Sequence, residues 1–428
     1  MPRFTASRHC LTSLCLTLAL FASFVQAENW PGWRGPRGDG SSQEKNVPTT
    51  WDGTTGENVA WKVGVPGTGH ASPVVWGDRI FLASCLEGES DRLLICVDRR
   101  NGKTLWQRSV MKSPLEKKHH LNSYASSTPA TDGTLVYVSF LEGSRAGEAQ
   151  GARMAVAAYD FDGNRQWLVH PGPFSSVHGY CSCPVLFEDK VIVNGDHDGD
   201  AYLVALDRAS GETIWKVPRE NKTRSYCTPI IRQIDGRWQM ILSGSKCVAS
   251  YDPHDGSRHW IIDGPTEQFV ASMVYNGDLL FLTAGFPDHH ILAIKPDGEG
   301  NVTDTHIVWR TTKNCSYVPS PIVAGDYFLV VSDEGIGSCY RAATGKRVWY
   351  DRLGPHYSAS LVTVGGLIYF LSDEGVTTVV KPADKYQEVA KNSLGEECYA
   401  SPAISQGQIY LRGVKHLYAI GGKEVAQR

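Results

Sequence analysis

Three acidic residues have a spacing that suits metal binding. In Asp196-x-Asp198-Gly199-Asp200 the acids alternate, and Ca²⁺ takes several oxygen ligands of this kind. The segment lacks the glutamate that ends an EF-hand calcium loop. Similar acids recur in Asp333-Glu334-Gly335 and Asp373-Glu374-Gly375, which favours a repeated hairpin turn over a cation site. We therefore assign no metal ligand.

A second set of residues suits ligand binding. An aromatic residue or a histidine stands just before or within the first strand of nearly every repeat described below. If these strands line a channel, the side chains form a ring near one mouth, where they either plug the channel or stack on a planar ligand, a sugar or a peptide. The eight residues are His70, Tyr124, Tyr180, Tyr226, Phe269, Tyr317, Tyr357 and Tyr399. Four histidines near this ring lack zinc-site spacing, namely His119, His120, His178 and His356.

The sequence lacks the motifs that are typical of serine hydrolases, metallopeptidases and nucleotide-binding proteins. The sequence has no Gly-x-Ser-x-Gly elbow, no His-Glu-x-x-His pair and no phosphate loop, so we assign no catalytic residue. Of the 11 cysteines, nine follow residue 27, and an odd number leaves at least one thiol without a partner in the chain. Cys181 and Cys183, and the pair Cys227 and Cys247, are the closest in sequence; we interpret them as small buried hydrophobes.

Residues 1–27 have the pattern of a signal peptide. Arg3 and Arg8 precede an apolar run that is too short for a membrane span and closes on Val25-Gln26-Ala27. An exported protein, periplasmic or extracellular and without a membrane span, is therefore expected. Loss of this segment would change the net charge from −3 to −5, and such an acidic balance excludes a nucleic-acid partner.

The elements that must position these residues repeat along the chain. Each unit begins with Ser or Thr before Pro, continues through two apolar strands and ends on Asp, Gly and Trp; the clearest copy begins at Ala71. Short β-branched or aromatic runs such as LVYVSF and YFLVVS, bounded by Gly and Asp, are typical of strands. Successive tryptophans from Trp106 are 61, 48, 45, 49 and 40 residues apart, which is the length of a four-stranded propeller blade.

Eight such units are predicted to close into a ring. The seventh aligns Val389 where its tryptophan should stand, and the eighth ends before its fourth strand. Residues 57–62 match a closing strand and are expected to complete that blade, which leaves the ring without an open edge. The prediction is an all-β, eight-bladed β-propeller of four-stranded antiparallel blades over residues 57–422, with an extension at 28–56 and a tail at 423–428.

The closing tryptophans are expected to dock neighbouring blades. The glycine of each ending takes the positive φ of a turn, and the indole buries a large area against the next blade. The seven residues are Trp61, Trp106, Trp167, Trp215, Trp260, Trp309 and Trp349.

These endings resemble the tryptophan-docking, PQQ-like repeat of the quinoprotein β-propeller superfamily. The clearest are Val97-Asp98-x-x-Asn101-Gly102-Lys103-x-x-Trp106 and Leu206-Asp207-x-x-Ser210-Gly211-Glu212-x-x-Trp215, and the resemblance covers nearly the whole chain after residue 27. One branch comprises the pyrroloquinoline-quinone (PQQ) dehydrogenases. The other comprises inert scaffolds such as the propeller lipoprotein of outer-membrane protein assembly. Residues 29–36 (NWPGWRGP) are similar to the start of exported propellers of the second kind.

The resemblance to the dehydrogenases implies a planar quinone between a tryptophan floor and a vicinal disulfide, with Ca²⁺ held by Asp or Glu and Asn. Ser182 separates Cys181 from Cys183, no tryptophan is an evident floor, and the long insertions of the enzymes' lid are missing. We therefore expect no cofactor, with PQQ and calcium as the alternative.

The function expected from the sequence is a non-catalytic scaffold that binds a protein or polymer partner. Insertions at residues 115–122 and 143–153 enlarge the first two units on one side, and insertions on one face of a repeat protein often build its binding surface. A PQQ- and calcium-dependent dehydrogenase and a carbohydrate-binding propeller are the alternatives. No feature of the sequence assigns an oligomeric state.

Overall fold

The computed structural model describes residue 1 and residues 27–144 and 151–422. Residues 2–26 of the expected signal peptide, the expected tail and residues 145–150 of the insertion therefore lie outside the described residues. The described residues form 33 β-strands and one short 3-10 turn, η1 (Glu87–Glu89). No helix in these ranges is long and apolar enough to cross a membrane.

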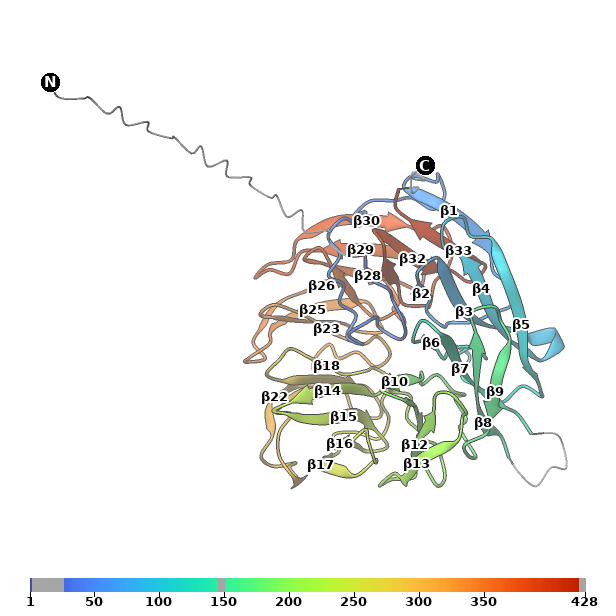
Figure 1. Cartoon of the computed structure of the whole chain (residues 1–428). Helices are drawn as coiled ribbons and strands as arrows, with labels where there is room; N and C mark the ends of the chain where they lie inside the picture. Colours follow the sequence, from blue (N-terminus) through green and yellow to red (C-terminus); the bar gives the residue numbers. More distant parts are fainter. Residues whose placement is uncertain (2–26, 145–150, 423–428) are drawn as a thin grey trace.

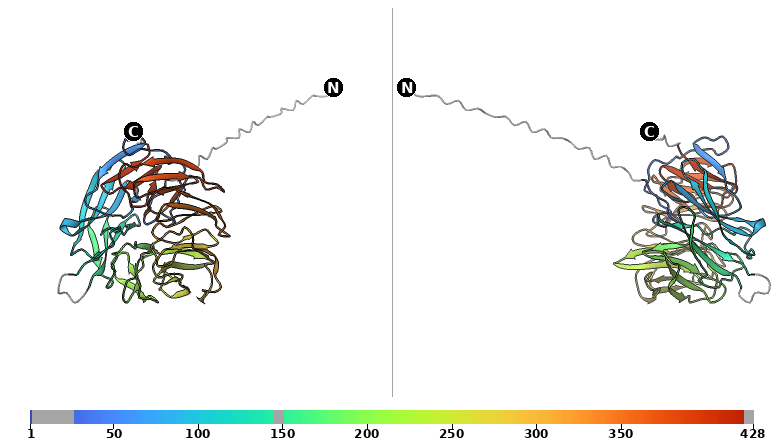
Figure 2. Two further views of the ribbon diagram at one scale, coloured as in Figure 1. Left: turned by 180° about the vertical axis from the view of Figure 1, so that it is seen from behind. Right: turned by 45° about the vertical axis from the view of Figure 1, so that its right-hand side comes forward.

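Eight antiparallel sheets follow one another around an axis, and the first strand of each lies innermost (Figures 1 and 2). Blades 1 and 2 comprise β2 (Val74–Trp76), β3 (Arg79–Leu86), β4 (Asp91–Asp98), β5 (Thr104–Lys112), and β6 (Ala130–Thr131), β7 (Leu135–Glu142), β8 (Arg153–Asp160), β9 (Arg165–Val169). Blades 3 and 4 comprise β10 (Val185–Phe187), β11 (Lys190–Gly195), β12 (Tyr202–Asp207), β13 (Thr213–Pro218), and β14 (Ile230–Ile234), β15 (Arg237–Gly244), β16 (Cys247–Tyr251), β17 (Arg258–Asp263). Blade 4 gains a fifth strand, β21 (Gly300–Asn301), parallel to β17.

The second half of the ring repeats this order. Blades 5 and 6 comprise β18 (Val274–Tyr275), β19 (Leu280–Ala284), β20 (His290–Ile294), β22 (Ile307–Thr311), and β23 (Ile322–Ala324), β24 (Tyr327–Val331), β25 (Ile336–Arg341), β26 (Arg347–Arg352). Blades 7 and 8 comprise β27 (Val362–Val364), β28 (Leu367–Leu371), β29 (Val376–Val380), β30 (Glu388–Ser393), and β31 (Ala403–Ser405), β32 (Gln408–Arg412), β33 (His416–Ile420), β1 (Val59–Gly64). The predicted eight-bladed, all-β propeller is confirmed.

The two ends of the chain close the ring. Strand β1 pairs antiparallel with β33, with Trp61 opposite Ala419, and the two strands lie side by side at the top of Figure 1. Side chains from β1, β3, β4, β28, β29 and β31–β33 share one hydrophobic cluster. The early strand therefore completes the last blade, as its sequence predicts.

Each of the seven closing tryptophans reaches the next blade through its indole N–H. Every Nε1 donates to a backbone carbonyl in the turn between the third and fourth strands of that blade, at 2.8–3.2 Å. The pairs are Trp61 with Arg99, Trp106 with Phe161, Trp167 with Arg208, Trp215 with Pro253, Trp260 with Pro296, Trp309 with Ala342, and Trp349 with Ala383. The same hydrogen bond, from a tryptophan indole to a backbone carbonyl of the next blade, thus recurs around the ring.

The seventh blade departs from this pattern, and the alignment of Val389 with the docking position is wrong by one residue. Ala390 pairs with Val379 as Trp106 pairs with Cys96, so Val389 takes the outward-facing place of Leu105. The cause is a longer connection: seven residues separate the paired residues Val380 and Glu388 of blade 7, whereas six separate the matching pair Val97 and Thr104 of blade 1. The blade also lacks an acceptor, because the third and fourth strands of blade 8 come from opposite ends of the chain and share no turn.

Trp51 of the N-terminal extension fills the space beside Ala390. Its ring stacks on Tyr369 of β28, with centroids 6.4 Å apart and planes 8° apart, and Ala390 packs against the same hydrophobic cluster. In blade 1 the docking Trp106 lies 6.0 Å from Phe81, the matching residue of β3. Trp51 therefore supplies from outside the repeats the aromatic side chain that blade 7 lacks.

Candidate functional site

One small polar side chain from each blade contributes to a girdle around the axis. In each blade it belongs to the residue just before the proline that leads into the first strand, or before the residue that replaces this proline. In six neighbouring pairs, the backbone N–H of one member donates to the side chain of the member in the next blade, at 2.8–3.2 Å. The girdle consists of Ser72, Thr128, Cys183, Thr228, Ser272, Ser320, Ser360 and Ser401. These bonds fix the spacing of the blades around the centre.

A cavity of about 850 Å³ lies on this axis. Residues two positions before the girdle line it in every blade, because alternate residues of an extended segment face the same side. These eight residues are His70, Ser126, Cys181, Tyr226, Val270, Val318, Ser358 and Tyr399. The lining therefore mixes aromatic, hydroxyl and apolar side chains.

The ring of eight expected from the sequence is only half realised at this cavity. His70, Tyr226, Tyr317 and Tyr399 line it. The remaining four do not: Tyr180, Phe269 and Tyr357 are buried, and Tyr124 packs against the core between blades 1 and 2. The buried three stand three residues before the girdle, where strand alternation turns a side chain between the blades; Tyr317 stands at the same position but still lines the cavity. Counting back two residues from the Ser or Thr of the motif would have found His70, Tyr226 and Tyr399. Ligand binding by the four that line the cavity stays a prediction.

The N-terminal extension closes one end of the cavity, which the sequence did not indicate. Trp33 lines the cavity and donates its Nε1–H to Ser272 Oγ at 3.0 Å. The neighbouring Arg34 is buried and donates to the carbonyl of Pro321 at 2.6 Å. Gly35 takes φ +78°, and a Cβ there would lie 2.7 Å from the Trp30 ring, so this close approach requires glycine.

The opposite end of the cavity is its mouth, beside the insertion at residues 115–122. His119, Leu121 and Asn122 of that insertion line the cavity, and Asn122 Nδ2 donates to the carbonyl of His178 at 2.8 Å. Of the other histidines singled out in the sequence, His178 and His356 line the cavity and His120 does not. The insertion thus builds one side of the mouth.

Two carboxylates hold the segments that carry the cavity residues. Asp333 accepts the backbone N–H groups of Tyr317 and Val318 at 2.7 and 3.0 Å. In the next blade Asp373 accepts the backbone N–H of Ser358 at 2.7 Å and contacts His356 Nδ1 at 2.5 Å. Burial raises the pKa of both carboxyl groups. These acids are positioning residues of a repeated turn.

The histidines of the mouth favour the neutral form. Burial, reinforced by the positive charges of Arg412 and Lys118, lowers the pKa of His70 to about 4. Burial and neighbouring basic groups also lower the pKa of His119 and of His178. At neutral pH these three imidazoles therefore bring polarity to the cavity without charge.

We expect His70 to make the stability of the protein depend on pH. Below about pH 6.5 the unfolded histidine binds a proton that the folded residue resists until about pH 4, so acidification across this window favours unfolding. Relative to its value at pH 7, the free energy of unfolding of the wild type at pH 4 should fall by about 2–3 kcal/mol more than that of His70→Gln. Urea unfolding of both proteins at the two pH values measures this difference. Equal losses would contradict the assignment.

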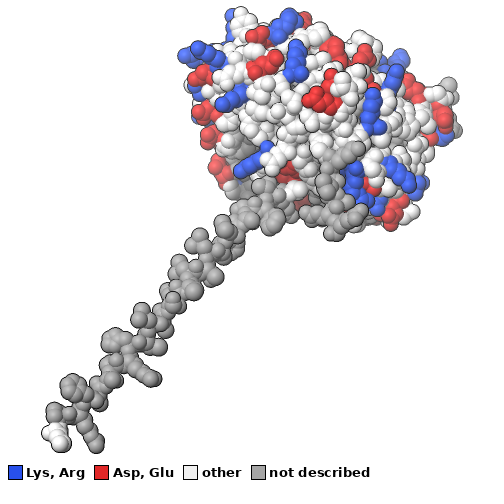
Figure 3. Space-filling view, turned by 90° about the horizontal axis from the view of Figure 1, so that it is seen from above, with Lys and Arg blue, Asp and Glu red and all other residues white. Residues whose placement is uncertain are grey.

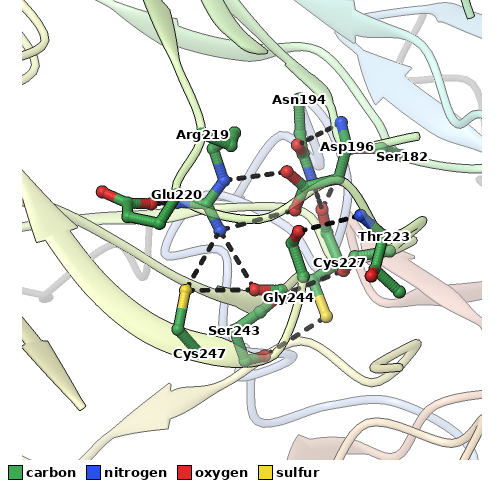
Figure 4. Close-up of polar contacts among 12 residues, drawn as sticks. Ser182, Asn194, Asp196, Arg219, Glu220, Thr223, Cys227, Ser243, Gly244 and Cys247 are labelled. Atoms are coloured by element: carbon green, nitrogen blue, oxygen red, sulfur yellow. Dashed lines mark hydrogen bonds and ion pairs between the residues drawn. The ribbon is translucent and has the colours of Figure 1, made fainter. Parts of the chain in front are cut away.

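The alternating acids that suggested calcium each have a basic partner. Asp196 pairs with Arg219 at 2.8 Å in the buried interior (Figure 4). Asp198 pairs with Arg224 at 2.7 Å, and Asp200 pairs with Lys222 at 2.5 Å. The three acids of blade 3 therefore bind three bases of the segment that leads into blade 4.

The family of the chain can be read from sequence comparison. The family described as outer membrane protein assembly factor BamB matches residues 41–167 and 90–351. The chain belongs to this BamB family. Comparison with the curated proteins found no match.

Solved structures share the BamB-like fold at low identity. BamB from Moraxella catarrhalis is 14% identical with a TM-score of 0.58, over 86% of this chain and 99% of that chain. A europium-containing methanol dehydrogenase is 12% identical with a TM-score of 0.53, over 91% and 90%. The computationally designed Ika8 protein is 10% identical with a TM-score of 0.57, over 83% and 98%. At these identities the likeness is one of fold.

The cavity of this BamB-family chain does not fit a quinone held with calcium. The nine cysteines of the described chain are all free thiols, so no vicinal disulfide covers the cavity. Two acidic side chains line it: Asp333 is engaged by two backbone N–H groups, and Glu334 is exposed. Among the described residues, no group of three or more His, Cys, Asp or Glu side chains could hold a metal ion. Trp33 alone matches the expected arrangement, as an aromatic floor.

Proposed function

We propose that this BamB-family propeller is a non-catalytic binding and scaffold module whose partner, a protein or a polymer, docks on the face that holds the cavity mouth. Three exposed apolar residues at this mouth carry the proposal. Leu121 and Phe286, which are 40% and 50% exposed, line the cavity, and Val177, which is 53% exposed, adjoins the lining residue His178. Apolar side chains gathered at a concave site are typical of interaction surfaces.

The distribution of charge supports a partner other than nucleic acid. On the side visible in Figure 3, Lys and Arg side chains are interspersed with Asp and Glu. Nucleic-acid binding requires a continuous basic surface that can neutralise phosphates. A periplasmic or extracellular location is part of the same proposal and is supported by the signal-peptide pattern of residues 1–27.

Site-specific crosslinking tests the docking face. We expect a benzophenone amino acid at Val177 to give a discrete adduct when the purified protein is irradiated in cell-envelope extract of the source organism. The same amino acid at Tyr350 is the matched control, because Tyr350 is 59% exposed but lies on β26, the outer strand of blade 6. Position 350 should give no discrete adduct.

The adducts from positions 177 and 350 are compared to test the docking face. An adduct from position 177 that disappears when Leu121 and Phe286 are both replaced by aspartate would support docking at the mouth. Equal adduct patterns from positions 177 and 350, or none from position 177, would contradict the proposed function.

A further inference from the structure

The cavity is blind, which limits what can enter it. Trp33 and Arg34 cross the axis at one end and are held by Ser272 and by the carbonyl of Pro321. The extension is fastened on both sides of this crossing, since Trp30 exchanges backbone hydrogen bonds with Val75 of blade 1 and Ser42 donates its backbone N–H to the carbonyl of Thr363 in blade 7. A polymer therefore cannot thread through the ring. Only a compact ligand, or the end of a chain, fits from the mouth.

Three neighbouring blades present polar atoms to the cavity. Contacts within the protein determine whether each atom donates or accepts a hydrogen bond. In blade 5, Gln268 is buried, lines the cavity and accepts the Tyr317 hydroxyl at Oε1, so its Nε2 remains a donor. In blade 6, Asn314 donates from Nδ2 to Ser338 Oγ, so its Oδ1 remains an acceptor. Both free atoms lack a hydrogen-bond partner among the described residues.

His356 completes this set in blade 7. Its Nδ1 is held by Asp373 at 2.5 Å, and in the neutral imidazole a carboxylate at Nδ1 selects the tautomer in which Nε2 carries the lone pair. The side chain lines the cavity, and its Nε2 has no partner within the described chain. The cavity therefore offers one fixed donor and two fixed acceptors before any ligand arrives.

The cavity offers an anionic ligand no unpaired basic side chain. Arg224, the basic residue of the lining, is paired with Asp198 at 2.7 Å. Of the two acidic residues, Asp333 is engaged by two backbone N–H groups and Glu334 is exposed to solvent. An anionic group, such as a peptide carboxyl terminus, would lose its hydration there without an unpaired positive charge. A neutral ligand loses much less.

Aromatic side chains supply flat apolar surface. Trp33 lies at the closed end, and Tyr226, Tyr317 and Tyr399 stand on the walls. A ligand that matches both features needs a flat apolar face for these rings and several hydroxyl groups that can both donate and accept hydrogen bonds. Sugar rings have this combination.

We propose that the blind cavity binds the end of a neutral saccharide chain, with a sugar ring against the aromatic wall and its hydroxyl groups hydrogen-bonded to Gln268, Asn314 and His356. This inference rests on the proposed function, because it assigns the polymer that enters the docking face. It requires no bond to be made or broken.

Calorimetry with the mature chain and linear oligomers of glucose, N-acetylglucosamine and mannose tests the inference. We expect saturable one-to-one binding of at least one series, with an affinity that stops rising once the chain end fills the cavity. His356→Phe and Gln268→Met should each weaken binding about tenfold, because each removes one preset hydrogen bond and leaves a sugar hydroxyl unpaired.

His416→Phe is the matched control. His416 also has Nδ1 against a carboxylate, Glu396 at 2.6 Å, but it does not line the cavity, so binding should be unchanged. Failure of every oligomer to bind, or equal binding by the wild type and His356→Phe, would overturn the inference. If position 177 still gives its adduct in either case, the docking face stands and only the saccharide is wrong. If saccharide binding and the adduct from position 177 are both absent, the proposed docking face is wrong as well.

Discussion

Trp51→Ala is expected to lower the free energy of unfolding by about 3–5 kcal/mol, as much as the loss of a large core aromatic. Trp51 is only 4% exposed although it lies outside the repeats, and it stacks on Tyr369 beside the small Ala390. Its removal should leave a cavity in blade 7 next to the blade that joins the two ends of the chain. Urea unfolding followed by circular dichroism measures the loss.

A pair of phenylalanine variants separates packing from hydrogen bonding. The buried Nε1 of Trp51 has no hydrogen-bond partner among the described residues, so Trp51→Phe keeps most of the stacking and should cost less than about 1.5 kcal/mol. Trp349→Phe also removes the bond to the Ala383 carbonyl at 3.0 Å and should cost about 1 kcal/mol more. If Trp51→Ala unfolded within about 1 kcal/mol of the wild type, Trp51 would not be the substitute for the missing docking tryptophan.

The ring could be predicted from the sequence because its determinants are local and repeated. Gly-centred turns, short β-branched strands and regularly spaced tryptophans fix each blade, and the early match to a closing strand fixes the seam between β1 and β33. The role of Trp51 was not visible in the same way. Its partner Tyr369 is far away in sequence, and a turn longer by one residue moved the docking position from Val389 to Ala390.

The candidate site was predicted less completely, for two physical reasons. The period of an extended segment is two, so a shift of one residue moves a side chain from the axis to the space between blades; Tyr226 and Tyr180 fall on different sides for this reason. The closed end depends on Trp33, which comes from a segment without a repeat. Only folding brings that segment to Ser272.

Asp196→Ala is expected to destabilise the protein by about 3–5 kcal/mol, because it removes the closer, fully buried one of the two carboxylates that pair with the buried Arg219. Arg219 and Asp196 both have fully buried side chains at the junction of blades 3 and 4. Arg219 also donates to the carbonyl of Gly244 at 3.2 Å (Figure 4) and to the hydroxyl of Tyr251. These neutral acceptors do not replace the lost carboxylate, and the carboxylate that remains, Glu220, is more distant at 3.4 Å and partly exposed. Chemical unfolding of the variant measures the loss.

Asp200→Asn is the matched control, because the pair of Asp200 with Lys222 is highly exposed and an exposed pair contributes about 0–1 kcal/mol. Replacing both buried partners with apolar residues, as in Asp196→Leu with Arg219→Met, should be less destabilising than Asp196→Ala alone, since no charge is then left unpaired. Equal losses for the single buried variant and the exposed control would mean that water reaches Arg219. The junction of blades 3 and 4 would then depend on apolar packing rather than on this ion pair.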